Sequence, residues 1–355
     1  MSITDLACRR VQELTPYQSA RRIGGVGRVY LNANESPEGI KFDLDSSSYN
    51  RYPECQPPEL IQAYADYIGV NPGHILVARG SDEVIGLLCR TFCEPGKDSI
   101  LICPPTYGMY SIAAETNGIA TIKVQPKDNF QPDLPAVFRS LKENSVKVLF
   151  LCSPNNPTGT IIERDLLIEI LKETAGKTLV VVDEAYIEFS PNDSCTDLLN
   201  EYSHLVVTRT LSKAFGLAGL RCGFALADPE IIGLLLKVID PYPICAPVAQ
   251  VATAALDPEN ICVMQKRVDE LNRIRNSFLE RCKTLKCVTD SFDCNGNYVL
   301  LKFKDGEKLF EGAKKAGFIL RDFNDKPMLK NCVRITVGSR AEMDDLFTFM
   351  KEHDE

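Results

Sequence analysis

The chain has 355 residues, of which 45% are hydrophobic, and it carries a formal net charge of −8. This length is sufficient for a large buried core, and the composition is that of a globular protein rather than a disordered one. The negative charge argues against a nucleic-acid-binding protein, which would need a basic face. We identify no signal peptide and no apolar run of the roughly 20 residues that cross a bilayer, so no membrane association is expected.

The cysteines and histidines do not follow a metal-binding pattern. There are 14 cysteines and three histidines, but Cys89 and Cys93 are not spaced as C-x2-C, and no histidine lies beside a cysteine cluster. We therefore expect no metal site. Many unpaired cysteines without an export signal are typical of the reducing cytoplasm, where we expect this protein to be located.

Residues 1–40 carry turn signals without a firm periodicity and are expected to form an N-terminal arm. Strands and helices alternate from about residue 75. Helices are predicted at "SDEVIGLLCRTFC" with Ser81 as the N-cap, at "ERDLLIEILKE", and at "DPEIIGLLLKVI" with Asp228 as the N-cap. Strands are predicted at residues 74–78, 98–103, 146–152, 178–183, 204–210 and 222–227. Their apolar runs are typical of strands buried on both faces, so a large α/β domain with a mostly parallel sheet is predicted at 41–240.

The pattern changes after Asp240. A long helical stretch is predicted from about 247 to 286, followed by a strand, a helix, a second strand and a last helix from about residue 340. The strands are "NYVLLKF" and "CVRITVG", and the helix between them is "EKLFEGAKKAG". We therefore expect a smaller α+β domain at 241–355.

Ligands of open α/β sheets bind at the carboxyl ends of the strands, so the residues that follow each strand are the candidates. Asp183 ends a buried strand and needs either a cap role or a cationic partner, because an unpaired buried charge is costly. Lys213 follows another strand, where desolvation and nearby cations can make its neutral amine a nucleophile, although an exposed surface lysine is the ordinary alternative. Ser81 and Asp82 begin a helix whose N–H groups either bind an anion or are simply capped.

Other strand ends add donors and an aromatic face. Ser212 and Arg221 can donate to a phosphate, and Tyr107 can cover a flat ring or pack in the core. Together with the lysine and the aspartate, these residues match one ligand, pyridoxal 5'-phosphate. Its aldehyde needs a lysine, its pyridinium nitrogen an acidic partner, and its phosphate a helix N-terminus with arginine support.

Four motifs resemble those of the fold-type I pyridoxal-phosphate-dependent aminotransferases: "SPNNPTG", "DEAY", "SKAFGLAGLRCG" and "VRITVG". More narrowly, "LTPYQSARR", "LNANESP" and "FCEPGKDSILICPPTYGMY" are similar to the histidinol-phosphate aminotransferase branch, and the similarity runs from about residue 14 to about 345. The resemblance implies a large domain with a mostly parallel mixed sheet flanked by helices, a smaller α+β domain and an N-terminal arm.

The resemblance also implies a role for each site residue. Lys213 would bind the cofactor aldehyde and move a proton at the substrate α-carbon, and Asp183 would pair with the ring nitrogen. Asn156 and Tyr186 would form hydrogen bonds to the phenolic oxygen of the cofactor, and Tyr107 would stack on its ring. The implied phosphate-binding residues are Ser81, Asp82, Thr210, Ser212, Arg221 and, from the partner subunit of a homodimer, Tyr52. The implied substrate-binding residues are Tyr17, Asn156, Arg321 and Arg334.

The implied function is transamination between L-histidinol phosphate and 2-oxoglutarate, giving imidazole-acetol phosphate and glutamate, in histidine biosynthesis. An aromatic amino acid aminotransferase and an amino-acid-phosphate decarboxylase are the alternatives on the same fold. A cofactor-sensing regulator would need a DNA-binding domain, but the region that carries the motifs starts almost at the N-terminus, and the chain is acidic. A nicotinamide-dependent dehydrogenase is disfavoured because no G-x-G-x-x-G follows the first strand.

Overall fold

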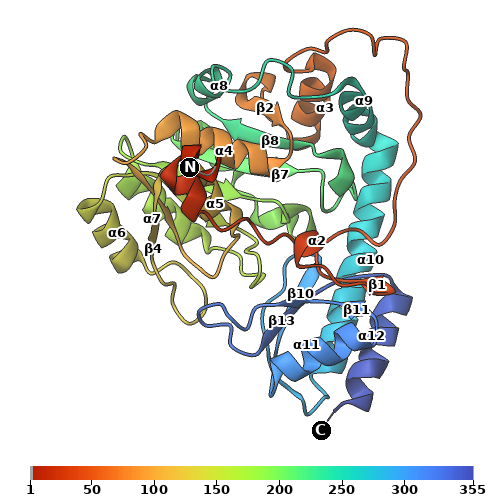
Figure 1. Cartoon of the computed structure of the whole chain (residues 1–355). Helices are drawn as coiled ribbons and strands as arrows, with labels where there is room; N and C mark the ends of the chain where they lie inside the picture. Colours follow the sequence, from red (N-terminus) through yellow and green to blue (C-terminus); the bar gives the residue numbers. More distant parts are fainter. Residues whose placement is uncertain (1–2, 355) are drawn as a thin grey trace.

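A computed structural model describes residues 3–354, so that residues 1, 2 and 355, at the ends of the predicted arm and small domain, lie outside it. Its largest element is a seven-stranded sheet in the order β2-β8-β7-β6-β5-β3-β4 (Figure 1). These strands are β2 (Ile75–Ala78), β3 (Ser99–Ile102), β4 (Ala120–Lys123), β5 (Val146–Cys152), β6 (Leu179–Asp183), β7 (Leu205–Thr210) and β8 (Gly223–Ala227). Strand β8 is antiparallel to both of its neighbours, and the other adjacent strands are parallel. The prediction of a mostly parallel mixed sheet is therefore confirmed.

Helices cover both faces of this sheet, which explains the apolar runs in its strands. Successive strand residues alternate between two apolar clusters, so that Leu149 and Leu151 lie in one cluster, and Val148 and Phe150 lie in the other. The first cluster includes residues of α3 (Pro58–Ile68), α6 (Leu134–Glu143) and α7 (Arg164–Thr174). The second includes residues of α4 (Ser81–Phe92), α5 (Met109–Thr116) and α8 (Pro229–Leu235).

A second, antiparallel sheet lies towards the C-terminus, in the order β12-β13-β10-β9 (Figure 1). Its strands are β9 (Val288–Ser291), β10 (Tyr298–Phe303), β12 (Arg321–Asp322) and β13 (Cys332–Thr336), and α11 (Gly306–Lys315) and α12 (Arg340–Glu352) lie beside it. The helical stretch predicted at 247–286 is two helices, α9 (Ala246–Ala255) and α10 (Pro258–Cys282). The break comes at Asp257, because Pro258 begins a new helix more easily than it continues one.

The N-terminal segment crosses between the two sheets. It contains η1 (Ile3–Leu6), α1 (Arg9–Glu13), α2 (Ala20–Ile23) and β1 (Val29–Tyr30). Arg10 donates to the carbonyl of Thr116 at the end of α5, and β1 pairs in parallel with β11 (Phe318–Ile319). Residues 31–34, which follow β1, are thereby placed between the large sheet and the C-terminal sheet.

The two predicted helix caps have different outcomes. Asp228 caps α8 as expected, since its carboxylate accepts the backbone N–H of Glu230 at 2.8 Å. The prediction for Ser81 is wrong: Ser81 is the first residue of α4, and Gly80, with a φ of 80°, is its N-cap. The reason is that the chain turns sharply between β2 and α4 through a backbone conformation that favours glycine.

Candidate active site

The carboxyl group of Asp183, the last residue of β6, is buried without a cation. Asp183 is only 2% exposed. Its carboxylate accepts a hydrogen bond from the Tyr110 hydroxyl at 2.7 Å and another from the Ala185 N–H at 3.2 Å. No lysine, arginine or histidine side chain that the structure describes forms an ion pair with it. Burial therefore raises the pKa of Asp183, and a cationic ligand would relieve this penalty.

Lys213 follows β7 in a loop that keeps its amine largely out of water. Its Nζ donates to the carbonyl oxygen of Ala33 at 3.0 Å and lies 5.6 Å from the ring centre of Tyr186. Burial, followed by the positive charge of Arg334, lowers the pKa of Lys213 to about 8. A useful fraction of the amine is therefore neutral near neutral pH, which is the form that attacks an aldehyde.

Two glycines open an anion site at the N-terminus of α4. A Cβ atom on Gly80 would lie 2.7 Å from Nη2 of Arg221, and one on Gly223 would lie 2.4 Å from the backbone nitrogen of Ser81. Only residues without a side chain let β8 and Arg221 come this close to the first N–H groups of the helix. These N–H groups are not used within the helix and can bind a phosphate.

Hydroxyl and guanidinium groups surround this helix end. Arg221 donates to Asp82 at 3.1 Å and to the Ser212 hydroxyl at 3.5 Å, and the Thr210 hydroxyl donates to Ser212 at 2.9 Å. The other carboxylate oxygen of Asp82 accepts from the Tyr107 hydroxyl at 2.9 Å. The five phosphate-site residues that were expected from this chain itself therefore lie together in the structure, namely Ser81, Asp82, Thr210, Ser212 and Arg221. Tyr107 contacts this group through its hydrogen bond to Asp82.

Two arginines that form no ion pair with any described carboxylate lie side by side on the C-terminal sheet. Arg321 and Arg334 are directly opposite each other in the register of β12 and β13, an arrangement that repels like charges. Arg334 is buried, and its guanidinium donates to the Asn156 side chain and, at 2.9 Å, to the carbonyl of Asn32. Its Nε has no partner among the described residues. Burial lowers the pKa of both arginines, so an anionic ligand would stabilise the pair.

Tyr17 and Tyr186 complete the site within this chain. The Tyr17 ring lies 6.5 Å from that of Tyr107, at an interplanar angle of 80°, and Arg321 is among the charges that act on the Tyr17 hydroxyl. Tyr186 is buried after β6, and its hydroxyl accepts a hydrogen bond from the Asn34 side chain at 3.0 Å. Burial raises the pKa of Tyr186, so its hydroxyl stays protonated and can donate.

Tyr52 is the one predicted site residue that this chain does not bring to the others. It is 80% exposed, and its ring stacks on that of Tyr242 at 4.4 Å between ring centres.

Sequence reasoning missed two residues that contact the candidate site residues. Tyr110, in the quoted "PPTYGMY" three residues after Tyr107, bonds to Asp183, and Asn34, inside the quoted "LNANESP", bonds to Tyr186. Their position in those motifs was the only available signal.

The residues present fit pyridoxal phosphate. A lone buried carboxyl suits the ring nitrogen, a lysine of lowered pKa suits the aldehyde, and a helix N-terminus with Ser212 and Arg221 suits the phosphate. The described residues contain no cluster of histidine, cysteine or acidic side chains that could hold a metal, and none of their helices has the length and apolar character to cross a membrane.

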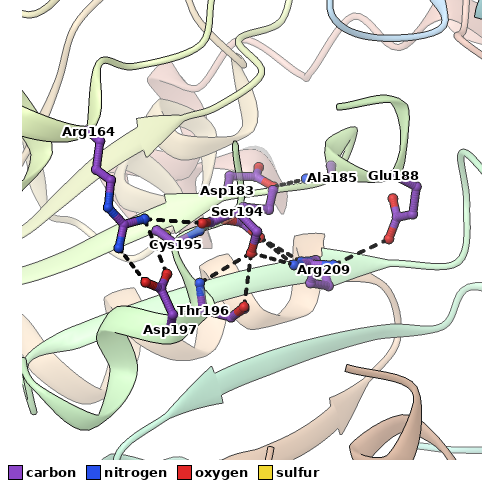
Figure 2. A network of polar contacts seen from close by, with 10 residues as sticks. Arg164, Asp183, Ala185, Glu188, Ser194, Cys195, Thr196, Asp197 and Arg209 are labelled. Atoms are coloured by element: carbon purple, nitrogen blue, oxygen red, sulfur yellow. Dashed lines mark hydrogen bonds and ion pairs between the residues drawn. The ribbon is translucent and has the colours of Figure 1, made fainter. Parts of the chain in front are cut away.

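The opposite face of the sheet holds a separate group of buried charges (Figure 2). Arg209 donates to Glu184 at 2.7 Å and lies 3.6 Å from Glu188. Glu184 also accepts from the backbone N–H of Cys195 at 2.7 Å and from the Ser194 hydroxyl at 3.2 Å. Burial raises the pKa of Glu188 to about 7 although Arg209 opposes this. This group links β6 and β7 to residues 194–195 from behind the candidate site.

Comparison with known proteins agrees with this geometry. A model of the family "Aminotransferase class I and II" matches residues 28–349. The histidinol-phosphate aminotransferase of Aeromonas hydrophila is 54% identical over 352 residues, which are 99% of this chain and 98% of that protein. The enzyme of the same name from Escherichia coli is 53% identical over 342 residues, 96% of each chain.

Solved structures show the same fold. The structure of histidinol-phosphate aminotransferase from Sinorhizobium meliloti in complex with pyridoxal-5'-phosphate has a TM-score of 0.84 at 22% identity and covers 97% of this chain and 96% of that one. The L-threonine-O-3-phosphate decarboxylase of Porphyromonas gingivalis has a TM-score of 0.76 at 20% identity and covers 92% and 99%. By family model and by near-full-length identity, this chain belongs to the aminotransferase class I and II family, in its histidinol-phosphate aminotransferase branch.

Proposed function

We propose that this enzyme uses pyridoxal phosphate to transfer the amino group of L-histidinol phosphate to 2-oxoglutarate, giving imidazole-acetol phosphate and glutamate, in histidine biosynthesis. The near-full-length identity to enzymes named for this substrate carries the proposal. The site supports it with a lysine of lowered pKa, a buried carboxyl without a cation and two arginines without carboxylates.

When bound, pyridoxal phosphate supplies an aldehyde that combines with amines and a ring that withdraws electrons from the substrate carbon. The chain supplies the rest. Asp183 holds a proton on the ring nitrogen through its charge, and Tyr186 donates to the phenolic oxygen. The Lys213 amine, with a pKa of about 8, would accept the proton of the substrate α-carbon and deliver it to the carbon that comes from the cofactor's aldehyde. The N-terminus of α4, Ser212 and Arg221 hold the phosphate.

Arg334 binds an anion in both half-reactions in this proposal. Histidinol phosphate presents a phosphate and 2-oxoglutarate presents carboxylates, and a planar guanidinium accepts either through two parallel hydrogen bonds. Arg334→Ala is therefore expected to weaken both half-reactions by roughly 2–5 kcal/mol, measured as kcat/KM for each substrate. A loss confined to the glutamate half-reaction would assign the phosphate to Arg321 instead.

A coupled transamination assay tests the substrate. Purified holoenzyme is given histidinol phosphate, phenylalanine or threonine phosphate as the amino donor, with 2-oxoglutarate as the acceptor. Histidinol phosphate should give the highest kcat/KM by at least an order of magnitude. Faster turnover of phenylalanine would favour an aromatic aminotransferase, and release of carbon dioxide from threonine phosphate would favour a decarboxylase.

The working form is a cytoplasmic homodimer in this proposal, with an arm at 1–40, a cofactor domain at 41–240 and a small domain at 241–355. The two separate sheets, at residues 75–227 and 288–336, support the division, and the free thiols support the reducing compartment.

Exposure of Tyr52 supports a role in the partner's site. Mixed dimers of Lys213→Ala and Tyr52→Ala chains would then regain about half of one wild-type dimer's activity, because one of their two sites is intact. Heterodimers without recovery would contradict the shared site.

A further inference from the structure

Asn34 occupies a buried position where three parts of the chain meet. Asn34 is 1% exposed. Its backbone has a φ of 53°, a left-handed conformation that asparagine tolerates better than most residues. The Asn297 side chain donates to its carbonyl oxygen at 3.0 Å, and its own N–H donates to the Thr336 hydroxyl at 2.9 Å. Asn297 and Thr336 belong to the C-terminal sheet and its margin, so this sheet fixes the position of Asn34.

The same contacts favour one orientation of the Asn34 side-chain amide, because the reversed amide would leave the Thr336 hydroxyl hydrogen without a described acceptor. The Thr336 hydroxyl oxygen accepts the Asn34 N–H, and its hydrogen is donated to Asn34 Oδ1 at 3.1 Å. The amide oxygen is therefore the atom on the Thr336 side. The amide nitrogen faces Tyr186 and donates to its hydroxyl at 3.0 Å.

This direction matters for the Tyr186 hydroxyl. An N–H of Asn34 occupies an acceptor position on the oxygen, so the Tyr186 hydrogen points elsewhere, and no described residue accepts it. Buried donors are normally paired, so this hydrogen is available to a ligand. We propose that Asn34 is a positioning residue that acts through Tyr186, directing the hydroxyl hydrogen of Tyr186 to the phenolic oxygen of bound pyridoxal phosphate. The inference rests on the proposed function.

The expected effect follows from hydrogen bonding to a charged form. A donor to the phenolic oxygen stabilises its anion and lowers the pH at which the bound cofactor loses its proton, which is visible as a change in absorbance. Asn34→Gly removes the side chain and keeps the left-handed backbone. The absorbance midpoint of the holoenzyme should then rise by about half a unit to one unit, the size of one hydrogen bond.

A double-mutant cycle with Tyr186→Phe tests whether the effect passes through Tyr186. Arg334, Lys213, Asp183, Cys152 and Tyr298 also act on or lie beside this hydroxyl, but they are common to all four proteins. Tyr186→Phe should raise the midpoint, and adding Asn34→Gly to it should produce no further rise. Two additive shifts would overturn the proposal.

Asn34→Asp gives an independent test and is the variant to use if Asn34→Gly does not fold. A carboxylate only accepts, so the Tyr186 hydroxyl would turn to donate to it and would be lost to the cofactor. The midpoint should rise more than in Asn34→Gly. The part of the rise that remains in the Tyr186→Phe background measures the added charge alone, and a rise that is equal in both backgrounds would contradict the proposal.

Asn297→Ala is the matched control, because it removes a hydrogen bond to the Asn34 backbone but leaves the donor to Tyr186. It should lower the unfolding temperature without moving the midpoint, and the dissociation constant of the cofactor should stay closer to wild type than in Asn34→Gly. Equal midpoint shifts in both variants would mean that loop packing is responsible, which overturns the inference.

The failure of this inference can be distinguished from the failure of the proposed function. If Tyr186→Phe leaves the midpoint unchanged, the proposed role of Tyr186 is wrong, and the role of Asn34 is wrong with it. A shift in Tyr186→Phe but none in Asn34→Gly refutes only the role of Asn34.

Discussion

The two faces of the sheet at the ends of β6 and β7 differ in the partners that they provide for a buried carboxyl group. Asp183 faces α5 and has a tyrosine and a backbone N–H as its partners, whereas Glu184, the next residue, is paired with Arg209 on the other face. Both residues are at most 2% exposed. Among the described residues, Glu184 therefore has a counterion and Asp183 has none, and this difference supports the proposal that a cationic ligand atom binds at Asp183.

The strand itself produces this contrast. Successive side chains of a strand point to opposite faces, so adjacent acidic residues are separated by the sheet. Arg209 lies on the same face as Leu205 and Val207, behind the site, and it therefore reaches Glu184 but not Asp183. The folded chain thus gives Glu184 a cationic partner and gives Asp183 none among the described residues, as the proposed role of Asp183 requires.

Asp183→Asn should have the largest effect on function. We expect turnover to fall at least about 1000-fold, or roughly 4 kcal/mol, because a neutral amide does not hold a proton on the ring nitrogen. The free energy of unfolding of the cofactor-free protein should fall by no more than about 1 kcal/mol, since no buried charge remains to be desolvated. Kinetics and urea unfolding measure the two quantities. Near-normal turnover in a cofactor-loaded variant would show that Asp183 does not have the proposed role in catalysis.

Arg209→Met should show the reverse pattern on the other face. It leaves Glu184 and Glu188 buried without a cation, which should lower the free energy of unfolding by about 3–5 kcal/mol. Arg164→Met is the matched control in the same group of contacts (Figure 2), because Arg164 and its partner Asp197 are largely exposed. That variant should cost less than about 1 kcal/mol. Equal costs in urea unfolding would show that burial does not distinguish the two arginines.

Glu188→Gln sharpens the comparison through pH. The pKa of Glu188 is about 7 in the folded protein and near its ordinary value of 4.5 when unfolded. Between these values the folded state keeps a proton that the unfolded state has released, so raising the pH favours unfolding. The wild type should lose on the order of 2–3 kcal/mol relative to Glu188→Gln between pH 4.5 and 7, and the difference should level off above about pH 8. Parallel stability curves for the two proteins would show that Glu188 titrates normally.

Much of the site could be predicted because it lies at strand ends. The apolar runs before Asp183 and Lys213 place both residues at one edge of a parallel sheet, and the helix start after β2 adds the N-terminus of α4, which is the proposed phosphate site. The arginine pair was predicted only through resemblance, since the register of β12 with β13 depends on tertiary pairing.

The remaining features depend on contacts between distant segments. Asn34 and Tyr186 are 152 residues apart, and Tyr110 and Asp183 are 73 apart, so no local pattern connects them. The wrong cap at Ser81 has a local cause, because the sequence does not reveal that Gly80 adopts a positive φ. Local propensity predicts where a helix starts more reliably than which residue ends the preceding turn.

The opposed arginines of β12 and β13 have a practical consequence for measurements on this enzyme. A pair of neighbouring guanidinium groups attracts any small dianion and not only a substrate. Inorganic phosphate or sulfate in a buffer will compete for Arg321 and Arg334, and monovalent salt will screen them to the extent that the site is open to water. If Arg321 and Arg334 bind the substrates as proposed, buffer composition is among the variables that set the apparent affinity for both substrates.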